Sequence, residues 1–273
     1  MRNSLETSPP EAPFDKRAVR RDFARAAGTY DRHADLQRRV AAEVTALYRR
    51  LAPARSGRVL DLGCGTGYVG KALVEGPEAP GTLLALDLAH PMTRRGRVPG
   101  HPAVTGDADH PPFAPESFDA MVSSLALQWS NDLEATLGGL VRILRPGGLL
   151  IASTLLDGTL RELDGALRRS GGHGRVGPFL DRTAAAAALA AAGLRGTECR
   201  SAREEDRAAD PMDVLRDLKG LGAVAKQPGR ARGLHGRNHL DALGRSYREA
   251  TGVPEGPVPV TWHVGYLLGW KPQ

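Results

Sequence analysis

The sequence predicts an α/β protein built on a mostly parallel sheet with helices on both faces. Short apolar runs at 59–62, 82–86, 118–123 and 149–154 have the length of buried strands, and helix-forming stretches separate them. A glycine-rich turn, Gly63-Cys-Gly-Thr-Gly67, joins the first run to a helix. Alternating strands and helices favour parallel strands with right-handed crossovers. We expect a ligand at the glycine turn, because a helix start offers unpaired N–H groups.

The length and composition are those of one large α/β core. The chain has 273 residues and no run near the roughly 20 apolar residues that cross a membrane. We expect no signal peptide, because the chain starts with a polar, Pro-rich segment. Cys64 and Cys199 provide neither a disulfide framework nor metal-ligand spacing, and Cys64 is either a reactive thiol or a small residue in the turn. We therefore expect a cytoplasmic, monomeric enzyme without a metal, a nucleic-acid partner or a membrane partner.

The net charge of +6 lies entirely in the first 60 residues. They hold 13 Lys and Arg against 7 Asp and Glu, whereas residues 61–273 hold 24 of each. A basic leader is typical of a protein with an acidic partner, and it also occurs as a plain solvated helix face. Both interpretations stay open. Under the first, the partner would meet Arg17, Arg20, Arg21 and Arg25.

The segment ahead of the glycine turn predicts a tail and a helical cap. Residues 1–13 are polar and Pro-rich, so we expect them to be disordered. A basic helix is expected over 16–27. A second helix is expected over 34–51, where apolar residues recur at steps of three and four. The cap would occupy 14–57 and precede a core at 58–273.

The loop between these two helices carries Tyr30 and His33. Both side chains could cover an active site. Alternatively, Tyr30 packs on the core and His33 lies on the surface.

Two ligand classes use a glycine turn of this kind, and the register of the glycines separates them. Gly65-Thr-Gly-Tyr-Val-Gly70 fits the dinucleotide pattern G-x-G-x-x-G, but its first glycine would lie two residues beyond the strand end. The register Asp61-x-Gly63-x-Gly65-x-Gly67 begins where the strand ends. It resembles motif I of class I S-adenosylmethionine-dependent methyltransferases, in which the acidic residue helps hold the amino-acid end of the cofactor. This resemblance assigns cofactor binding to Asp61, Gly63, Cys64, Gly65 and Gly67.

Residues at the ends of the following strands extend the expected cofactor site. Asp87 ends the second strand, where a carboxylate can accept both ribose hydroxyls, and a helix N-cap is the alternative. Leu88 and Met92 follow and could enclose the adenine, although the prolines beyond them limit the next helix to about one turn. After a third strand at 101–105, Asp107 could accept the adenine amino group, with Asp109 as the competing choice. Ala108 and Leu125, which also follow strand ends, complete the set.

The C-terminal half adds two segments that we expect on the substrate side of the core. Residues 155–180 contain a helix over 160–168, followed by a Gly-rich stretch at 170–178 that could act as a lid. Residues 205–250 contain two further helices, and a final strand is predicted over 258–270. The remaining elements are an Ala-rich helix that Asp181 caps and a polar strand that ends at Arg203.

Four further motifs resemble the malonyl-acyl-carrier-protein O-methyltransferases of biotin synthesis. The similarity spans about residues 14–270, and it departs from the family in the Pro- and Gly-rich stretch after Asp87 and in the loop near Gly171. The motifs are Phe23-x6-Tyr30-Asp-x-His-Ala-x-Leu-Gln37, Ser124-Leu-Ala-Leu-Gln-Trp129, Leu218-Lys-Gly-Leu-Gly-Ala223 and Thr261-Trp-His-Val264.

The resemblance implies a Rossmann-like class I methyltransferase fold, with a seven-stranded, mostly parallel sheet whose last strand is antiparallel and inserted near the edge. It also implies S-adenosyl-L-methionine as cofactor, S-adenosyl-L-homocysteine as product, and methyl transfer to the free carboxylate of malonyl-acyl carrier protein. That carboxylate is ionised at pH 7, so no general base is required.

No residue is a firm catalytic candidate. By their places in the matched motifs, Tyr30, Lys219 and His263 could bind the carboxylate, and each could equally be structural. Trp129 and Trp262 could form walls of a substrate pocket or pack in the core. Two other functions stay open: a small-molecule methyltransferase acting on a quinone or a free carboxylic acid, and a cofactor-binding protein without catalysis.

Overall fold

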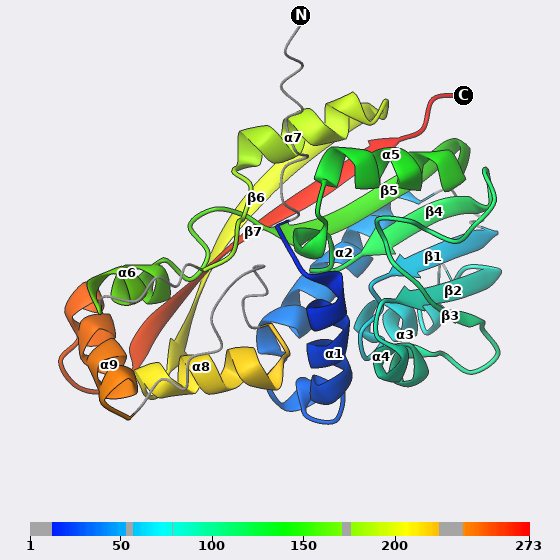
Figure 1. The fold of residues 1–273 in the computed structure, drawn as a ribbon. Coiled ribbons are helices and arrows are strands. Elements are labelled where there is room, and N and C mark those ends of the chain that lie inside the picture. The colour runs from blue at the N-terminus through cyan, green and yellow to red at the C-terminus, as the bar shows by residue number, and fades with distance from the viewer. Residues whose placement is uncertain (1–12, 53–56, 78, 171–175, 224–236) are drawn as a thin grey trace, which may run out of the picture.

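The computed structural model describes residues 13–52, 57–77, 79–170, 176–223 and 237–273. Its strands form one seven-stranded sheet in the order β3-β2-β1-β4-β5-β7-β6 (Figure 1). The strands are β1 (Arg58–Leu62), β2 (Thr82–Asp87), β3 (Ala103–Thr105), β4 (Phe118–Ser123), β5 (Leu144–Leu155), β6 (Arg195–Ala208) and β7 (Val258–Trp270). The α-helices are α1 (Lys16–Ala26), α2 (Asp35–Leu51), α3 (Tyr68–Val74), α4 (His90–Gly96), α5 (Leu133–Ile143), α6 (Arg161–Arg169), α7 (Arg182–Ala191), α8 (Pro211–Gly220) and α9 (Arg237–Thr251). Two short 3₁₀ helices are η1 (Tyr30–Arg32) and η2 (Leu127–Trp129).

The sheet confirms the expected topology. Strands β1 to β5 pair in parallel, and β7 runs antiparallel between β5 and β6. Strand β6 continues five residues beyond the predicted end at Arg203, because it pairs with β7 all the way to Ala208. The polar sequence of β6 hid this length, since an edge strand needs little apolar surface.

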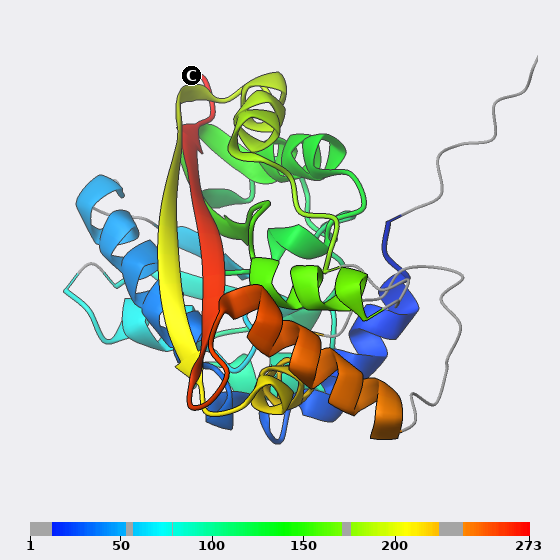
Figure 2. The ribbon, with the colours of Figure 1, turned by 90° about the vertical axis from the view of Figure 1, so that its left-hand side faces the viewer.

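Helices cover both faces of the sheet. Helices α2 and α3 pack on one face through buried residues such as Val44, Tyr48 and Leu73. Helices α5 and α7 pack on the other face through residues such as Leu140 and Leu189. Figure 2 shows α2 on one side of the sheet and the α5 and α7 layer on the opposite side. Helix α2 therefore belongs to the main core, although it precedes the glycine turn in sequence.

Helices α6, α8 and α9 form a separate group at one end of the β6–β7 pair, as Figures 1 and 2 both show. They share a cluster of buried residues that includes Leu163, Val214 and Tyr247. These helices come from the two segments expected on the substrate side. Residues 1–12 of the tail expected at 1–13, and residues 171–175 of the possible lid at 170–178, lie outside the described residues.

Local signals explain where several helices begin. Asp181 is the N-cap of α7, as the sequence predicted, and Asp210 is the N-cap of α8; their side chains accept hydrogen bonds from Ala184 N and Met212 N. Within the described residues, no helix is long and apolar enough to cross a membrane.

Candidate active site

The glycine turn after β1 adopts backbone angles that only glycine takes easily. Gly63, Gly65 and Gly67 have φ values of 70°, 53° and 93°. A Cβ at Gly63 would lie 2.3 Å from Ala126 Cβ, whereas a Cβ at Gly65 would meet no atom within 4 Å. The backbone at Gly65 therefore borders open space that a ligand can fill.

A cavity lies over this turn, and we call it the glycine-turn cavity. Residues from α1, η1, the glycine turn and the ends of β2, β3 and β4 line it. Most residues of the expected cofactor set are among them, namely Gly63, Gly65, Asp87, Leu88, Met92, Asp107, Ala108 and Leu125. Residues spread over more than 60 positions of the chain thus meet around one space, as a parallel sheet with adjacent strand ends allows.

Asp87 is part of the cavity wall. Its Oδ2 accepts a hydrogen bond from Gly65 N at 3.0 Å, and its Oδ1 accepts one from Ala89 N at 2.8 Å. Burial raises the pKa of this carboxyl group to about 6. The carboxyl group therefore joins the end of β2 to the glycine turn and borders the space where a ligand would lie.

Asp61, Cys64 and Gly67 do not line the cavity. Asp61 Oδ2 accepts a hydrogen bond from Gly70 N at 3.0 Å, and burial raises the pKa of Asp61 to about 7. Asp61 therefore fixes the start of α3 to β1. The Cys64 side chain lies beside Gly96 of α4, where an added Cβ would come within 2.8 Å of Cys64 Sγ, and burial raises the pKa of its thiol. A buried thiol of this kind is a poor nucleophile, so Cys64 is a packed residue of the turn.

Lys16 lines the cavity on the side of α1, although no motif in the sequence points to it. Its Nζ lies 3.0 Å from Asp107 Oδ1 and 2.8 Å from Asp109 Oδ2. One ammonium group thus contacts both Asp107 and Asp109, the two alternative candidates for the contact with the adenine amino group. No local pattern connects Lys16 with residues more than 90 positions away.

A second cavity, of about 320 Å³, adjoins the first, and we call it the apolar cavity. Helices α1, α6 and α8, the segment before α7 and strand β7 contribute to it. The two cavities share a wall formed by Phe23, Tyr30, Leu125 and Trp129. Edge-to-face contacts order the aromatic part of this wall. The ring centroid of Trp129 lies 5.5 Å from the ring centroid of Phe23 and 5.3 Å from that of Phe14.

Tyr30 faces both cavities from η1. Its hydroxyl has no hydrogen-bond partner among the described residues. Burial, followed by the negative charge of Asp87, raises the pKa of Tyr30, so the hydroxyl stays protonated at pH 7. Tyr30 can therefore donate a hydrogen bond to a group in the shared wall.

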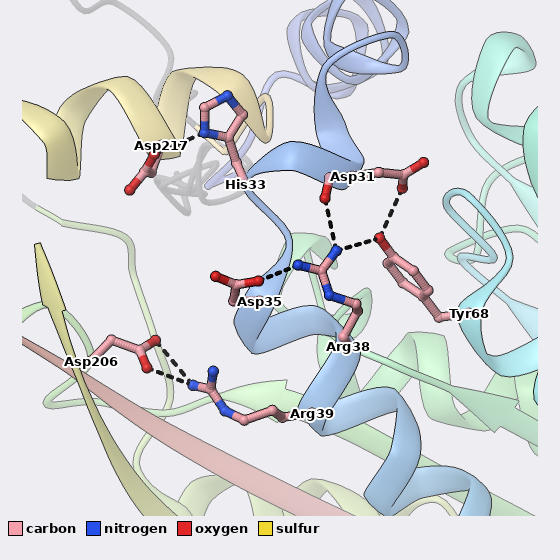
Figure 3. Close-up of polar contacts among 8 residues, drawn as sticks. All are labelled: Asp31, His33, Asp35, Arg38, Arg39, Tyr68, Asp206 and Asp217. Atoms are coloured by element: carbon pink, nitrogen blue, oxygen red, sulfur yellow. Dashed lines mark hydrogen bonds and ion pairs between the residues drawn. The ribbon is translucent and has the colours of Figure 1, made fainter.

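Polar contacts hold the short helix that carries Tyr30 (Figure 3). Asp31 Oδ1 accepts hydrogen bonds from Thr66 Oγ1 at 2.6 Å and from Tyr68 OH at 2.9 Å. Arg38 Nη1 donates to the Asp31 carbonyl at 2.7 Å. These contacts tie η1 to the glycine turn and α3, so Asp31 is a positioning residue beside Tyr30.

On the opposite side of η1, His33 Nδ1 lies 2.8 Å from Asp217 Oδ1 of α8 (Figure 3). Arg39 of α2 binds Asp206 of β6 with distances of 2.8 and 3.0 Å. The N-terminal helices are therefore linked to the elements around the apolar cavity as well as to the glycine turn.

Lys219 and His263 occupy different surroundings. Lys219 lines the apolar cavity, is the only charged side chain among the described residues that line it, and has no ion-pair partner in the described part of the chain. His263 lines neither cavity, and its Nδ1 lies 2.7 Å from the Asp157 carbonyl oxygen. The side chain of Trp262, its neighbour on β7, lines the cavity instead, because successive side chains of a strand point to opposite faces. Over the described ranges, no group of three or more His, Cys, Asp or Glu could hold a metal ion.

Comparisons with known proteins agree with this architecture. A family model described as a methyltransferase domain matches residues 60–152, from β1 to β5. The malonyl-acyl-carrier-protein O-methyltransferase of Methylovorus sp. is 38% identical over 273 residues, which covers 95% of this chain and 90% of the relative. The protein of the same name from Halorhodospira halophila is 37% identical over 264 residues, with 94% and 88% covered. The chain belongs to the malonyl-acyl-carrier-protein O-methyltransferase family. The crystal structure of YcgJ from Bacillus subtilis has the same fold, with a TM-score of 0.61, 16% identity, and 85% and 99% of the two chains covered.

Membership of this family makes the protein a methyltransferase that uses S-adenosylmethionine. The glycine-turn cavity fits that cofactor, because the space beside Gly65 is open and a buried carboxyl group borders it. The general domain model ends before α6, so the helices around the far side of the apolar cavity lie outside it. Similarity to the family itself extends over this C-terminal part.

Proposed function

We propose that this protein transfers a methyl group from S-adenosylmethionine to the free carboxylate of malonyl-acyl carrier protein, which gives the malonyl methyl ester for biotin synthesis. The observation that carries the proposal is Lys219, a cation without an ion-pair partner among the described residues, in the wall of a cavity that is otherwise apolar or neutral. Such a cavity favours an anionic group on a neutral chain. The names of the relatives support the identity of that chain.

The cofactor would lie in the glycine-turn cavity. Asp87 would accept the ribose hydroxyls, and Leu88 and Met92 would contact the adenine from one side. Asp107, which Lys16 orients, would accept the adenine amino group. The amino-acid end would lie against the open backbone of the glycine turn.

The shared wall would be the place of methyl transfer. When bound, S-adenosylmethionine supplies an electrophilic methyl group on a sulfonium centre. Lys219 would attract the malonyl carboxylate, the protonated Tyr30 would donate a hydrogen bond to one of its oxygens, and Trp129 and Phe23 would exclude water. Among the described residues that line the apolar cavity there is no His, Asp or Glu to act as a base. The nucleophile is ionised without one, so orientation supplies the catalysis, which can lower a barrier by roughly 7–11 kcal/mol.

The outer face of α1 would meet the acidic carrier protein. Arg17 and Arg20 are exposed and have no ion-pair partner among the described residues, whereas Arg21 and Arg25 both lie near Asp22 Oδ1, at 3.2 and 3.9 Å. The same helix lines both cavities through Phe23. Complementary charge on α1 would raise the rate of encounter close to the site. The cytoplasmic location and the monomeric state stay predictions.

A direct assay tests this function. Labelled S-adenosylmethionine is supplied with malonyl-acyl carrier protein, malonyl-coenzyme A or free malonate, and the product is treated with mild base. We expect a base-labile methyl ester, formed fastest with the carrier protein. At saturating cofactor the rate should be flat between about pH 6 and 8, because the nucleophile is ionised throughout. Methylation at carbon, with no ester released by base, would instead indicate an enzyme acting on a quinone.

A further inference from the structure

Two glutamine side chains in the apolar cavity present buried oxygen atoms without a partner. Gln37 Oε1 and Gln128 Oε1 are both buried, and neither finds a hydrogen-bond donor among the described residues. Both residues line the apolar cavity. A buried polar atom is nearly always paired in a folded protein, and an unpaired one costs about 1–3 kcal/mol. Both atoms belong to residues of the cavity wall, where a small rotation of the amide would bring the oxygen to a hydrogen-bond donor of a bound ligand.

The orientation of the Gln128 amide is determined by its neighbour. Gln128 Nε2 donates to the Leu125 carbonyl at 2.7 Å. A carbonyl oxygen only accepts, so the amide atom that faces it must be the nitrogen. The unpaired atom is therefore the oxygen, which requires a donor. Gln37 makes no comparable contact among the described residues.

The position of Gln128 limits which donor it can meet. It lies in η2 between Leu125 and Trp129, two residues of the wall through which the methyl group would pass. In a malonyl thioester, the carboxylate and the thioester carbonyl only accept hydrogen bonds. The first N–H in the substrate is that of the amide nearest the sulfur in the pantetheine arm. About six bonds separate its nitrogen from the carboxylate carbon, so an extended arm places it near the side chains that surround the shared wall.

We propose that Gln128 is a specificity-determining residue whose Oε1 accepts a hydrogen bond from the amide N–H nearest the thioester of the substrate arm. The proposal rests on the function proposed above. With the carboxylate at the shared wall, this hydrogen bond can form only when the carboxylate and the amide are separated by the length of a malonyl group. A longer dicarboxylic acyl chain would move the amide away from Gln128, so the contact selects the malonyl group.

A pair of small substrates tests the contact. The first is the malonyl thioester of N-acetylcysteamine, which carries only the amide nearest the sulfur. The second is the malonyl thioester of 2-mercaptoethyl acetate, in which an ester oxygen replaces that N–H. The wild-type protein should prefer the amide substrate by about tenfold in kcat/KM, because the ester leaves Gln128 Oε1 unpaired. In Gln128→Met, which keeps the side-chain length, the preference should fall to about one.

The matched control is Gln37→Met. The small substrate has a single N–H, so this variant should keep the tenfold preference if Gln128 is its partner. A loss of the preference in Gln37→Met and not in Gln128→Met would overturn the assignment. If Gln128 has a purely structural role in holding Leu125, Gln128→Met would lower kcat/KM equally for both substrates. The unchanged ratio of the two values would also refute the proposal. Weaker binding of S-adenosylmethionine by Gln128→Met, with an unchanged ratio, would show that the oxygen contacts the cofactor instead.

The same experiment separates this proposal from the proposed function. If the wild-type protein methylates the amide and ester substrates equally well, the function stands and the role of Gln128 is wrong. If it methylates neither of them nor malonyl-acyl carrier protein, both are wrong. Circular dichroism and thermal unfolding of each variant establish that it is folded before its kinetics are compared.

Discussion

Replacing Lys219 with methionine tests the electrostatic basis of substrate selection. Methionine keeps an unbranched apolar side chain and removes the only charge among the described residues that line the apolar cavity. A hydrogen bond to a charged group contributes about 1.5–3 kcal/mol, which corresponds to roughly 10- to 100-fold in kcat/KM. Lys219 is exposed to solvent, which screens its charge. We therefore expect the lower end of this range, about a tenfold loss.

The assay is steady-state methylation of malonyl-acyl carrier protein at saturating S-adenosylmethionine, with calorimetry for cofactor binding. The matched control is Arg216→Met, which removes a charge from the same helix. Arg216 is 67% exposed, is paired with Asp213 and does not line the cavity. Only Lys219→Met should lower kcat/KM, and neither variant should change cofactor affinity. An equal loss in both variants, or less than a twofold loss in Lys219→Met, would refute a direct contact with the carboxylate.

Three further changes address the cofactor, the glycine turn and the partner. Asp87→Asn should weaken S-adenosylmethionine binding more than tenfold in calorimetry, because charge-assisted hydrogen bonds to the ribose are lost. The affinity of the wild-type protein should also fall as the pH drops through about 6, where Asp87 takes up a proton. An affinity that is independent of pH would remove Asp87 from the site. Burial raises the folded-state pKa of Asp61 to about 7, so its contribution to stability is present below the unfolded pKa near 4 and is lost as the pH rises through about 7. The always neutral Asp61→Asn should consequently stabilise the free protein more at pH 8 than at pH 5, by up to about 3 kcal/mol, and thermal unfolding that shows the same difference at both pH values would contradict this. Replacing Arg17 and Arg20 with Glu should raise KM for malonyl-acyl carrier protein and leave KM for small malonyl thioesters unchanged. The increase should disappear as the salt concentration rises from about 0.05 to 0.5 M. An equal increase in KM for both substrates would mean that this helix face is only solvated.

The sequence alone was sufficient to predict the central βαβ unit. It was also sufficient to explain why this unit offers a ligand site. The three alternating glycines require positive φ, which is a local property of the backbone, and all three adopt it. Asp87 could be placed because the end of a parallel strand next to such a turn always borders the same crevice. Helix starts at Asp181 and Asp210 were predictable for a similar reason, since an N-cap hydrogen bond spans only a few residues.

Only the tertiary structure decided which side chains enter the two cavities. Asp61 and His263 occupy matched motifs, but strand register turns the first toward Gly70 and the second toward the Asp157 carbonyl. Lys16 reaches the glycine-turn cavity from α1, and nothing in its local sequence marks it. Gln37 ends a matched motif, but only the packing of α2 brings it to the apolar cavity. Backbone conformation is set by neighbours in the chain, whereas the surroundings of a side chain depend on how distant elements pack. The sequence could therefore locate the glycine turn, whereas the packing of α1, η1, η2 and α8 decided which residues of the matched motifs line the two cavities.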